Sequence, residues 1–113
     1  MIPEFNTIKD VPKKFTGECL ILYEFNGKEK NPFKCWFKNG IIHREGGPAC
    51  VWENIDYEQW IQNGEFHRLD GHAVIDIQFK TPRYYIHGRE YGLKDYWKHP
   101  FVIQHKLKMI MDL

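Results

Sequence analysis

One segment of this 113-residue chain is repeated without gaps 24 residues later. Residues 36–49 read WFKNGIIHREGGPA, and residues 60–73 read WIQNGEFHRLDGHA. A third copy begins at Tyr84, again 24 residues on, but it has Tyr91 where the first two copies have histidine. Terminal copies of a stacked repeat are commonly atypical because they cap the stack. The spacing therefore predicts a repeat protein with an altered last copy.

Each full copy contains an Asn-Gly pair between apolar or aromatic residues, at positions 39–40 and 63–64. The type I′ turn of a β-hairpin needs positive φ at both central residues, which asparagine and glycine tolerate. We expect a turn at each pair, and a further turn at residues 26–27 after a strand over residues 19–25. Successive hairpins of this kind form a twisted antiparallel meander.

The remaining elements follow from the period of the apolar residues. Alternation over residues 57–61 and 73–79 predicts strands with one buried face. Near the C-terminus the period becomes helical, with apolar residues on one side of a helix. These residues are Ile103, Leu107, Ile110 and Met111. A shorter helical segment over residues 93–99 is expected to end before Pro100, which suits the first turn of the next helix.

The predicted fold class is mainly β with a C-terminal helix: an antiparallel β-hairpin repeat capped by one or two α-helices. A chain of this length builds one core, so we expect a single domain over residues 1–113. Its parts are an N-terminal cap hairpin at 18–32, the 24-residue hairpin repeats at 33–91 and a helical cap at 92–113.

The spacing Asn-Gly-x-x-His followed by small residues resembles the MORN repeat, a hairpin unit of similar length. A closer resemblance is to a variant with the pattern Trp-Tyr-x-Asn-Gly-x-x-His-Arg-x-Asp-Gly-Pro-Ala, found in small proteins of tailed bacteriophages and some large DNA viruses. Residues 43–49 and 67–73 carry it, and it covers about residues 33–99. Gly46 replaces the usual aspartate and His72 the usual proline. The resemblance implies a MORN-like meander.

The viral resemblance implies a small accessory protein that binds and blocks a host or anti-phage defence protein. It would act in the cytoplasm of the host cell. The first residues lack the basic start and apolar core of a signal peptide, and no apolar run of about 18 residues occurs. We therefore expect a cytoplasmic protein without a membrane span, acting as a non-enzymatic protein–protein interaction module.

Catalytic residues are not apparent. The chain has no serine, and its three cysteines show no nucleophile signature near a histidine. Their odd number and their spacings of 16 and 15 residues fit neither a disulfide framework nor a zinc knuckle, so we interpret Cys19, Cys35 and Cys50 as reduced, buried or half-buried thiols. We expect no enzyme.

Two His-Arg pairs recur at one position of the repeat, His43–Arg44 and His67–Arg68. Two strand spacings separate the histidines by roughly 9 to 10 Å, too far to share one metal ion. We therefore expect no metal and no cofactor. The arginine forks are expected to bond Asp70 or a free carbonyl in a neighbouring turn. The alternative is an exposed row that binds an anionic, nucleotide-like molecule.

Aromatic residues recur with the same period at Trp36, Trp60 and Tyr84, and we expect these rings to form a ladder in the sheet core. Other aromatic residues are candidate anchors for a partner, because Trp, Tyr and Arg dominate interface hot spots. The candidates are Phe33, Phe37, Trp52, Tyr57, Tyr84 and Tyr85.

Charge is distributed unevenly along the chain. Residues 41–80 hold 3 basic and 7 acidic side chains, which argues against DNA, because phosphate binding needs clustered Lys and Arg. The C-terminal helix is expected to pack on the sheet. A more specific alternative is a homodimer formed through the apolar residues of this helix, and a third interpretation is a helix that lies on a membrane surface. The dimer residues would be Phe101, Ile103, Leu107 and Ile110.

Overall fold

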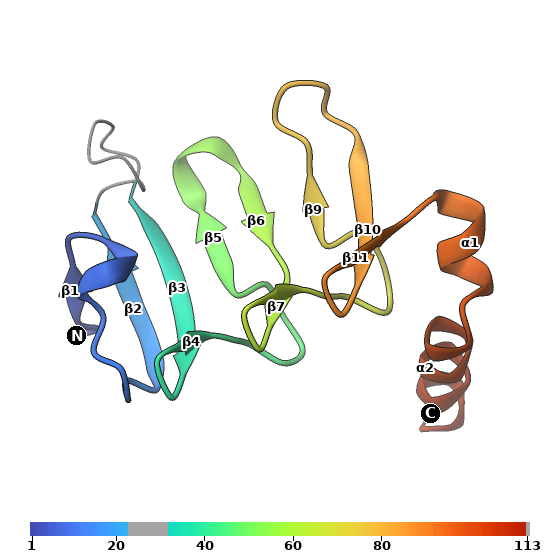
Figure 1. Cartoon of the computed structure of the whole chain (residues 1–113), viewed down its shortest axis with the longest axis horizontal. Coiled ribbons are helices and arrows are strands. Elements are labelled where there is room, and N and C mark those ends of the chain that lie inside the picture. Colours follow the sequence, from blue (N-terminus) through green and yellow to red (C-terminus); the bar gives the residue numbers. More distant parts are fainter. Residues whose placement is uncertain (23–31, 113) are drawn as a thin grey trace. The chain divides into compact units, whose positions relative to one another are not determined.

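The computed structural model describes residues 1–22 and 32–112 (Figure 1). Strand makes up 34% and helix 23%, so the fold is mainly β with a C-terminal helix, as predicted. The chain divides into two compact units, unit 1 at Met1–Gly64 and unit 2 at Glu65–Leu113. The turn expected at residues 26–27 lies outside the described residues.

Unit 1 contains one six-stranded sheet with the order β1-β2-β3-β5-β6, in which β4 also pairs with β3. β1 runs parallel to β2, whereas the other pairs are antiparallel. The strands are β1 Glu4–Phe5, β2 Gly17–Ile21, β3 Phe33–Lys38, β4 Ile41–Ile42, β5 Cys50–Trp52 and β6 Tyr57–Gln59. A short strand, β7 Ile61–Gln62, follows. Several small sheets replace a single continuous meander.

The core of unit 1 lies on one face of this sheet. Successive side chains of a strand point to opposite faces, and Phe33, Cys35 and Phe37 of β3 are all buried. Trp36 therefore lies on the opposite face, half-buried, with the guanidinium carbon of Arg44 at 4.0 Å from its ring centroid. The prediction that Trp36 lies in the core is wrong, because the alternation of β3 directs the side chains of Cys35 and Phe37 into the core instead.

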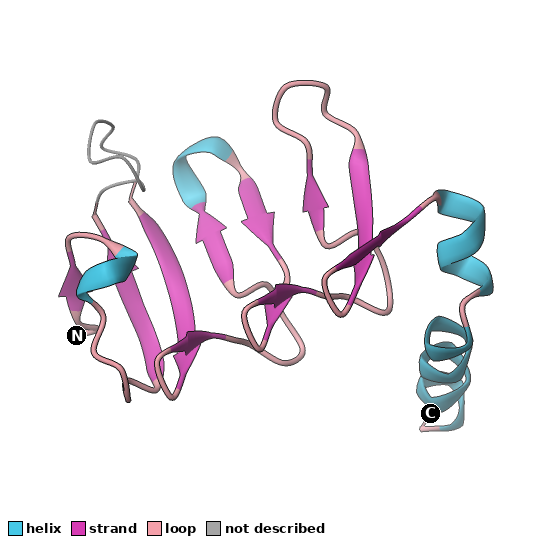
Figure 2. Cartoon of the chain, in the orientation of Figure 1, coloured by secondary structure: helices cyan, strands magenta, loops and turns pink. Residues whose placement is uncertain are grey.

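Unit 2 contains the short strand β8, a three-stranded antiparallel sheet with the order β11-β10-β9, and two helices (Figure 2). The elements are β8 Glu65–Phe66, β9 Val74–Ile75, β10 Pro82–Ile86, β11 Arg89–Tyr91, α1 Leu93–Lys98 and α2 Pro100–Met111. Its core contains Ile86, Tyr96 and Val102. The helical cap thus packs on the last hairpin of the sheet through α1 and one residue of α2.

The strand predicted over residues 73–79 is wrong in length, because β9 ends at Ile75. The Asp76 carboxylate accepts a 2.9 Å hydrogen bond from the backbone N–H of Phe79, and the Asp76 carbonyl accepts one of 2.7 Å from Lys80. Local bonds of an aspartate side chain compete with the strand ladder and close a turn. Ile77 and Phe79 are consequently 65% and 70% exposed.

The repeat turns have the predicted conformation. φ is 50° at Asn39 and 78° at Gly40, and 51° and 78° at the equivalent residues 63 and 64. The third copy forms the same turn with His87 and Gly88, at 47° and 81°. Each copy also bonds the next in one register. Gly64 N–H donates to the Ile42 carbonyl in unit 1, and Gly88 N–H to the Phe66 carbonyl in unit 2, both at 2.8 Å.

The helices break where the sequence predicts. His99 is extended, with ψ of 135°, as expected for a residue before proline, and Pro100 takes the first position of α2. Nδ1 of His99 accepts a 3.1 Å hydrogen bond from the backbone N–H of Phe101 and caps α2. The expected burial of α2 on the sheet is wrong, however, since only Val102 of this helix is buried.

Candidate functional site

The repeated histidines accept backbone hydrogen bonds. Nδ1 of His43 accepts one of 2.9 Å from the N–H of Asn63, and Nδ1 of His67 accepts one of 2.9 Å from the N–H of His87. His67 is 5% exposed, and its ring stacks on that of His87 at 4.2 Å. Burial, and then the nearby charge of His87, lower the pKa of His67 to about 4. His67 is therefore a neutral ring at pH 7 that holds a turn.

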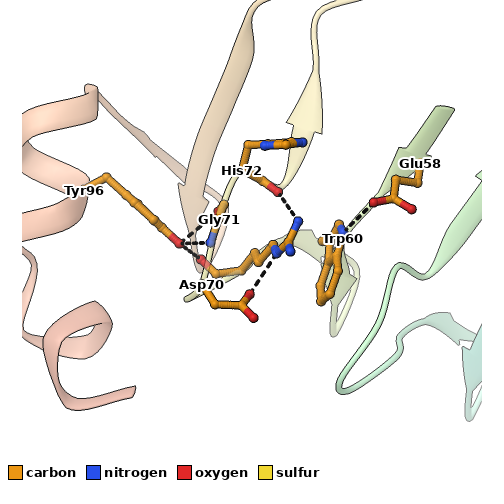
Figure 3. Close-up of polar contacts among 7 residues, drawn as sticks. Glu58, Trp60, Asp70, Gly71, His72 and Tyr96 are labelled. Atoms are coloured by element: carbon orange, nitrogen blue, oxygen red, sulfur yellow. Dashed lines mark hydrogen bonds and ion pairs between the residues drawn. The ribbon is translucent and has the colours of Figure 1, made fainter. Parts of the chain in front are cut away.

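The repeated arginines are bonded within their own loops. Nη1 of Arg44 donates to the Pro48 carbonyl at 3.1 Å, and Nη1 of Arg68 donates to the His72 carbonyl at 3.0 Å. Nε of Arg68 also donates to the Asp70 carboxylate at 2.8 Å (Figure 3). These contacts match the structural interpretation of the His-Arg pairs. The alternative, an exposed row that binds an anion, gains no support from this geometry.

The glycines of the same loops are explained by these arginines. A Cβ atom on Gly47 would lie 3.1 Å from the guanidinium carbon of Arg44, and one on Gly71 would lie 3.1 Å from that of Arg68. Contacts this short force a neighbour to move, so a side chain at either position would displace the fork from its carbonyl. The spacing of Arg and Gly that the two copies share is thus explained by close packing of each arginine on its glycine.

Tyr96 of α1 makes a contact that the sequence reasoning missed. Its hydroxyl accepts a 3.2 Å hydrogen bond from the Gly71 N–H and donates to the Arg68 carbonyl (Figure 3). The side chain is fully buried, and burial raises the pKa of its phenol. The only sequence signal was its place in the predicted helical cap.

The aromatic candidates are used for internal packing. Trp52 is 9% exposed and stacks on Phe33 with 4.3 Å between ring centroids. Tyr84 is half-buried, 4.7 Å from the ring of Tyr96, and Tyr85 lies 5.1 Å from the ring of Phe66. These rings therefore offer little free surface to a partner.

Most of the exposed apolar side chains of unit 2 lie on its two helices, and the others are Ile75, Ile77 and Phe79. We call the set on the helices the helical apolar surface: Leu93, Trp97, Phe101, Ile103, Leu107, Met109, Ile110 and Met111, with exposed fractions from 41% to 82%. Isolated exposed apolar residues are normal, but contiguous ones mark interaction sites. Ile103, Leu107 and Ile110 share one side of α2, because residues three or four apart are neighbours on a helix.

A groove of about 380 Å³ lies on the other side of α2. Its lining residues are Leu69, His87, Phe101, Gln104, His105 and Lys108, all of unit 2. None of them is acidic. The groove thus combines two apolar side chains with side chains that donate hydrogen bonds.

The three cysteines form a row across β2, β3 and β5, where Cys35 pairs with Cys19 on one side and Cys50 on the other. All are buried, and Sγ of Cys35 lies 3.1 Å from Sγ of Cys50. Burial raises the pKa of Cys19 to about 12, and the contact with Cys50 raises that of Cys35. Protonated thiols are poor nucleophiles.

Within residues 1–22 and 32–112, no three His, Cys, Asp or Glu side chains are placed to hold a metal ion. None of the described helices has the length and apolar character to cross a bilayer.

Comparison of the chain with family models, curated proteins and solved structures found no match. The resemblance to a viral MORN variant therefore stays a prediction.

Proposed function

We propose that this chain is a non-catalytic protein–protein interaction module that binds its partner through the helical apolar surface. The observation that carries the proposal is the exposure of eight apolar side chains on α1 and α2. A large apolar side chain contributes about 1.5–3 kcal/mol when it is fully buried, so a partner that covers several of them gains substantial binding energy.

The way α2 is anchored supports this role. Tyr96 and Val102 pack into the core of unit 2, and His99 caps the helix, so the helices are held in place by few residues. The side of α2 that carries Ile103, Leu107 and Ile110 remains available, with exposed fractions of 44%, 54% and 59%. A fixed helix with an open apolar side is the arrangement used in helix-in-groove recognition.

The other chemical groups of the described chain have structural contacts instead. Arg44 and Arg68 bond carbonyls, and His43 and His67 bond turn N–H groups. The described cysteines are buried, and the raised pKa of Cys19 and of Cys35 disfavours their thiolates. These contacts support binding rather than catalysis as the role of the chain.

The partner class comes from the viral resemblance. We take the partner to be a host or anti-phage defence protein that the chain blocks by contact. An inhibitor of this kind needs a surface complementary to its target and no chemistry of its own, which agrees with a helical apolar surface as its main exposed feature.

The test is affinity capture from phage-infected bacteria that express the tagged full chain, followed by mass spectrometry. The informative variant is Leu107→Asp with Ile110→Asp, and the matched control is Ile77→Asp with Phe79→Asp, since all four side chains are at least half exposed. One stoichiometric protein that is lost with the helix variant and kept with the turn variant would support the proposal. Capture of no such protein, or equal capture by both variants, would contradict it.

A further inference from the structure

We infer that the groove beside α2 binds an acidic peptide segment of the partner protein. A carboxylate of that segment would lie among His87, His105 and Lys108, and an apolar side chain beside it would contact Leu69 and Phe101. This inference rests on the proposed function, because it names the chemistry of the partner.

Charge is the first argument. The polar residues of the groove are His87, Gln104, His105 and Lys108, and each presents N–H donors. Residues 100–111 of α2 carry Lys106 and Lys108 and no aspartate or glutamate. An anion in the groove therefore meets donors and a positive helix without a like charge on α2 to oppose it. A carboxylate is the anionic group that a protein segment supplies most readily.

The identity of residue 87 is the second argument. Asn39 and Asn63 start the turns of the first two copies, and His87 stands at the same position of the third with the same left-handed backbone, φ 47°. Asparagine and histidine both adopt this conformation more often than most other non-glycine residues do. The side chain of His87 is exposed, lines the groove and meets the ring of Phe101 edge-on at 6.1 Å. The third copy thus places an imidazole, stacked on the ring of His67 at 4.2 Å, at a turn position whose side chain reaches the groove.

The form of the groove decides between a peptide and a small molecule. Sites for small ligands enclose most of the ligand surface. Here His87, Phe101, Gln104 and Lys108 are exposed, so the groove is open along α2. A volume of about 380 Å³ holds a few side chains of a segment that lies across the surface. Phe101 belongs both to the groove and to the helical apolar surface, so a longer partner can contact both.

The experiment measures fluorescence anisotropy of two labelled peptides with the full chain. One peptide is Glu-Asp-Leu-Glu-Asp-Leu-Glu, and the other is its amide counterpart Gln-Asn-Leu-Gln-Asn-Leu-Gln. We expect the acidic peptide to bind at least about tenfold more tightly than the amide peptide, which is the difference expected for one charge-assisted hydrogen bond. Its affinity should fall with added salt. Equal affinities, or no binding at about 1 mM acidic peptide, the weak end of specific recognition, would overturn the inference.

A matched pair of variants tests the location. Lys106→Glu and Lys108→Glu make the same charge change in exposed residues of one helix, but only Lys108 lines the groove. Lys108→Glu should weaken the acidic peptide about tenfold more than Lys106→Glu does. Equal weakening would show a diffuse charge effect and no site. Displacement of the acidic peptide by ATP at a lower concentration than by the unlabelled peptide would show a small-anion site and overturn the peptide assignment.

The inference and the proposed function fail in different ways. If affinity capture yields a partner that depends on Leu107 and Ile110, but the acidic peptide does not bind, the function stands and the groove inference is wrong. If the acidic peptide binds through Lys108 but no partner is captured, the groove stands as an acidic-peptide site and the proposed function is wrong.

Discussion

Nδ1 of His43 accepts a hydrogen bond of 2.9 Å from the backbone N–H of Asn63, which starts the turn of the following copy. His67 and His87 repeat this bond at the same length and the same separation along the chain. The histidine of each copy therefore holds the turn of the next one. This contact is a physical reason for a histidine that recurs every 24 residues, and it requires the ring nitrogen to be unprotonated.

That requirement predicts a dependence of stability on pH. The pKa of His67 falls from 6.5 to about 4 on folding, so the unfolded chain binds more protons between these values. The contribution of the neutral His67 ring to the free energy of unfolding should be fully present above pH 6.5. It should be lost as the pH drops toward 4. The loss is about 2 kcal/mol between pH 7.5 and 5, of a total of about 3 kcal/mol.

Urea unfolding of the wild type and of His67→Gln at both pH values measures this loss. The His67→Gln variant should lack the part of the pH dependence that His67 supplies. The control His105→Gln, which replaces a half-buried histidine of α2, should retain that part. An unchanged pH dependence in His67→Gln would show that His67 is protonated in the folded chain.

The turn at Asn39–Gly40 gives a second prediction. Gly40 has φ of 78°, and a Cβ atom there would overlap the Lys13 carbonyl. Gly46 has φ of 75° with no atom within 4 Å of its Cβ position. Gly46→Ala should therefore lose only the cost of a left-handed alanine, about 1 kcal/mol, and Gly40→Ala about 3 kcal/mol or more, since overpacking adds to it.

Tryptophan fluorescence in a urea titration measures both free energies of unfolding. The two glycines have similar positive φ angles, 78° and 75°, so the difference between the variants chiefly reports the close approach to Lys13. Equal losses would mean that the segment containing Lys13 does not pack against this turn.

Local chemistry explains which elements were predictable from the sequence. Asn-Gly pairs and Pro100 act through their own backbone preferences, so the turns at 39–40 and 63–64 and the break between α1 and α2 lie where they were expected. The third copy forms the same kind of turn, with His87 and Gly88 at similar φ angles, although it has no Asn-Gly pair from which the turn could be predicted.

Other features depend on contacts that the sequence pattern does not encode. The apolar period of residues 73–79 suits a strand, but the side chain of Asp76 closes a turn. Trp36 has the period of a core residue, but alternation along β3 places Cys35 there instead. The helical period of α2 is real, yet a period shows which residues share a side and not what covers them.

Tyr96 gives a third prediction. Tyr96→Phe removes the hydroxyl that bonds the Gly71 N–H and the Arg68 carbonyl, and it leaves these two groups without that partner. We expect a loss of about 1–3 kcal/mol in the free energy of unfolding. Tyr85→Phe is the control, because it removes a hydroxyl from a half-buried tyrosine of β10. Similar losses for the two variants in urea titrations would contradict a specific role for the Tyr96 hydroxyl.

The buried cysteines give the last prediction. It also tests the proposal that the chain is non-catalytic. A pKa of about 12 for Cys19, against 9.0 for a free thiol, reduces its thiolate at neutral pH about a thousandfold. Labelling of the folded chain by a thiol reagent should therefore be slow and should accelerate as urea unfolds it. Ile77→Cys supplies a control in a 65% exposed position that should label at once. A native cysteine that labels as fast as this control would be an accessible nucleophile, and a covalent reaction would then have to replace simple binding as the proposed role.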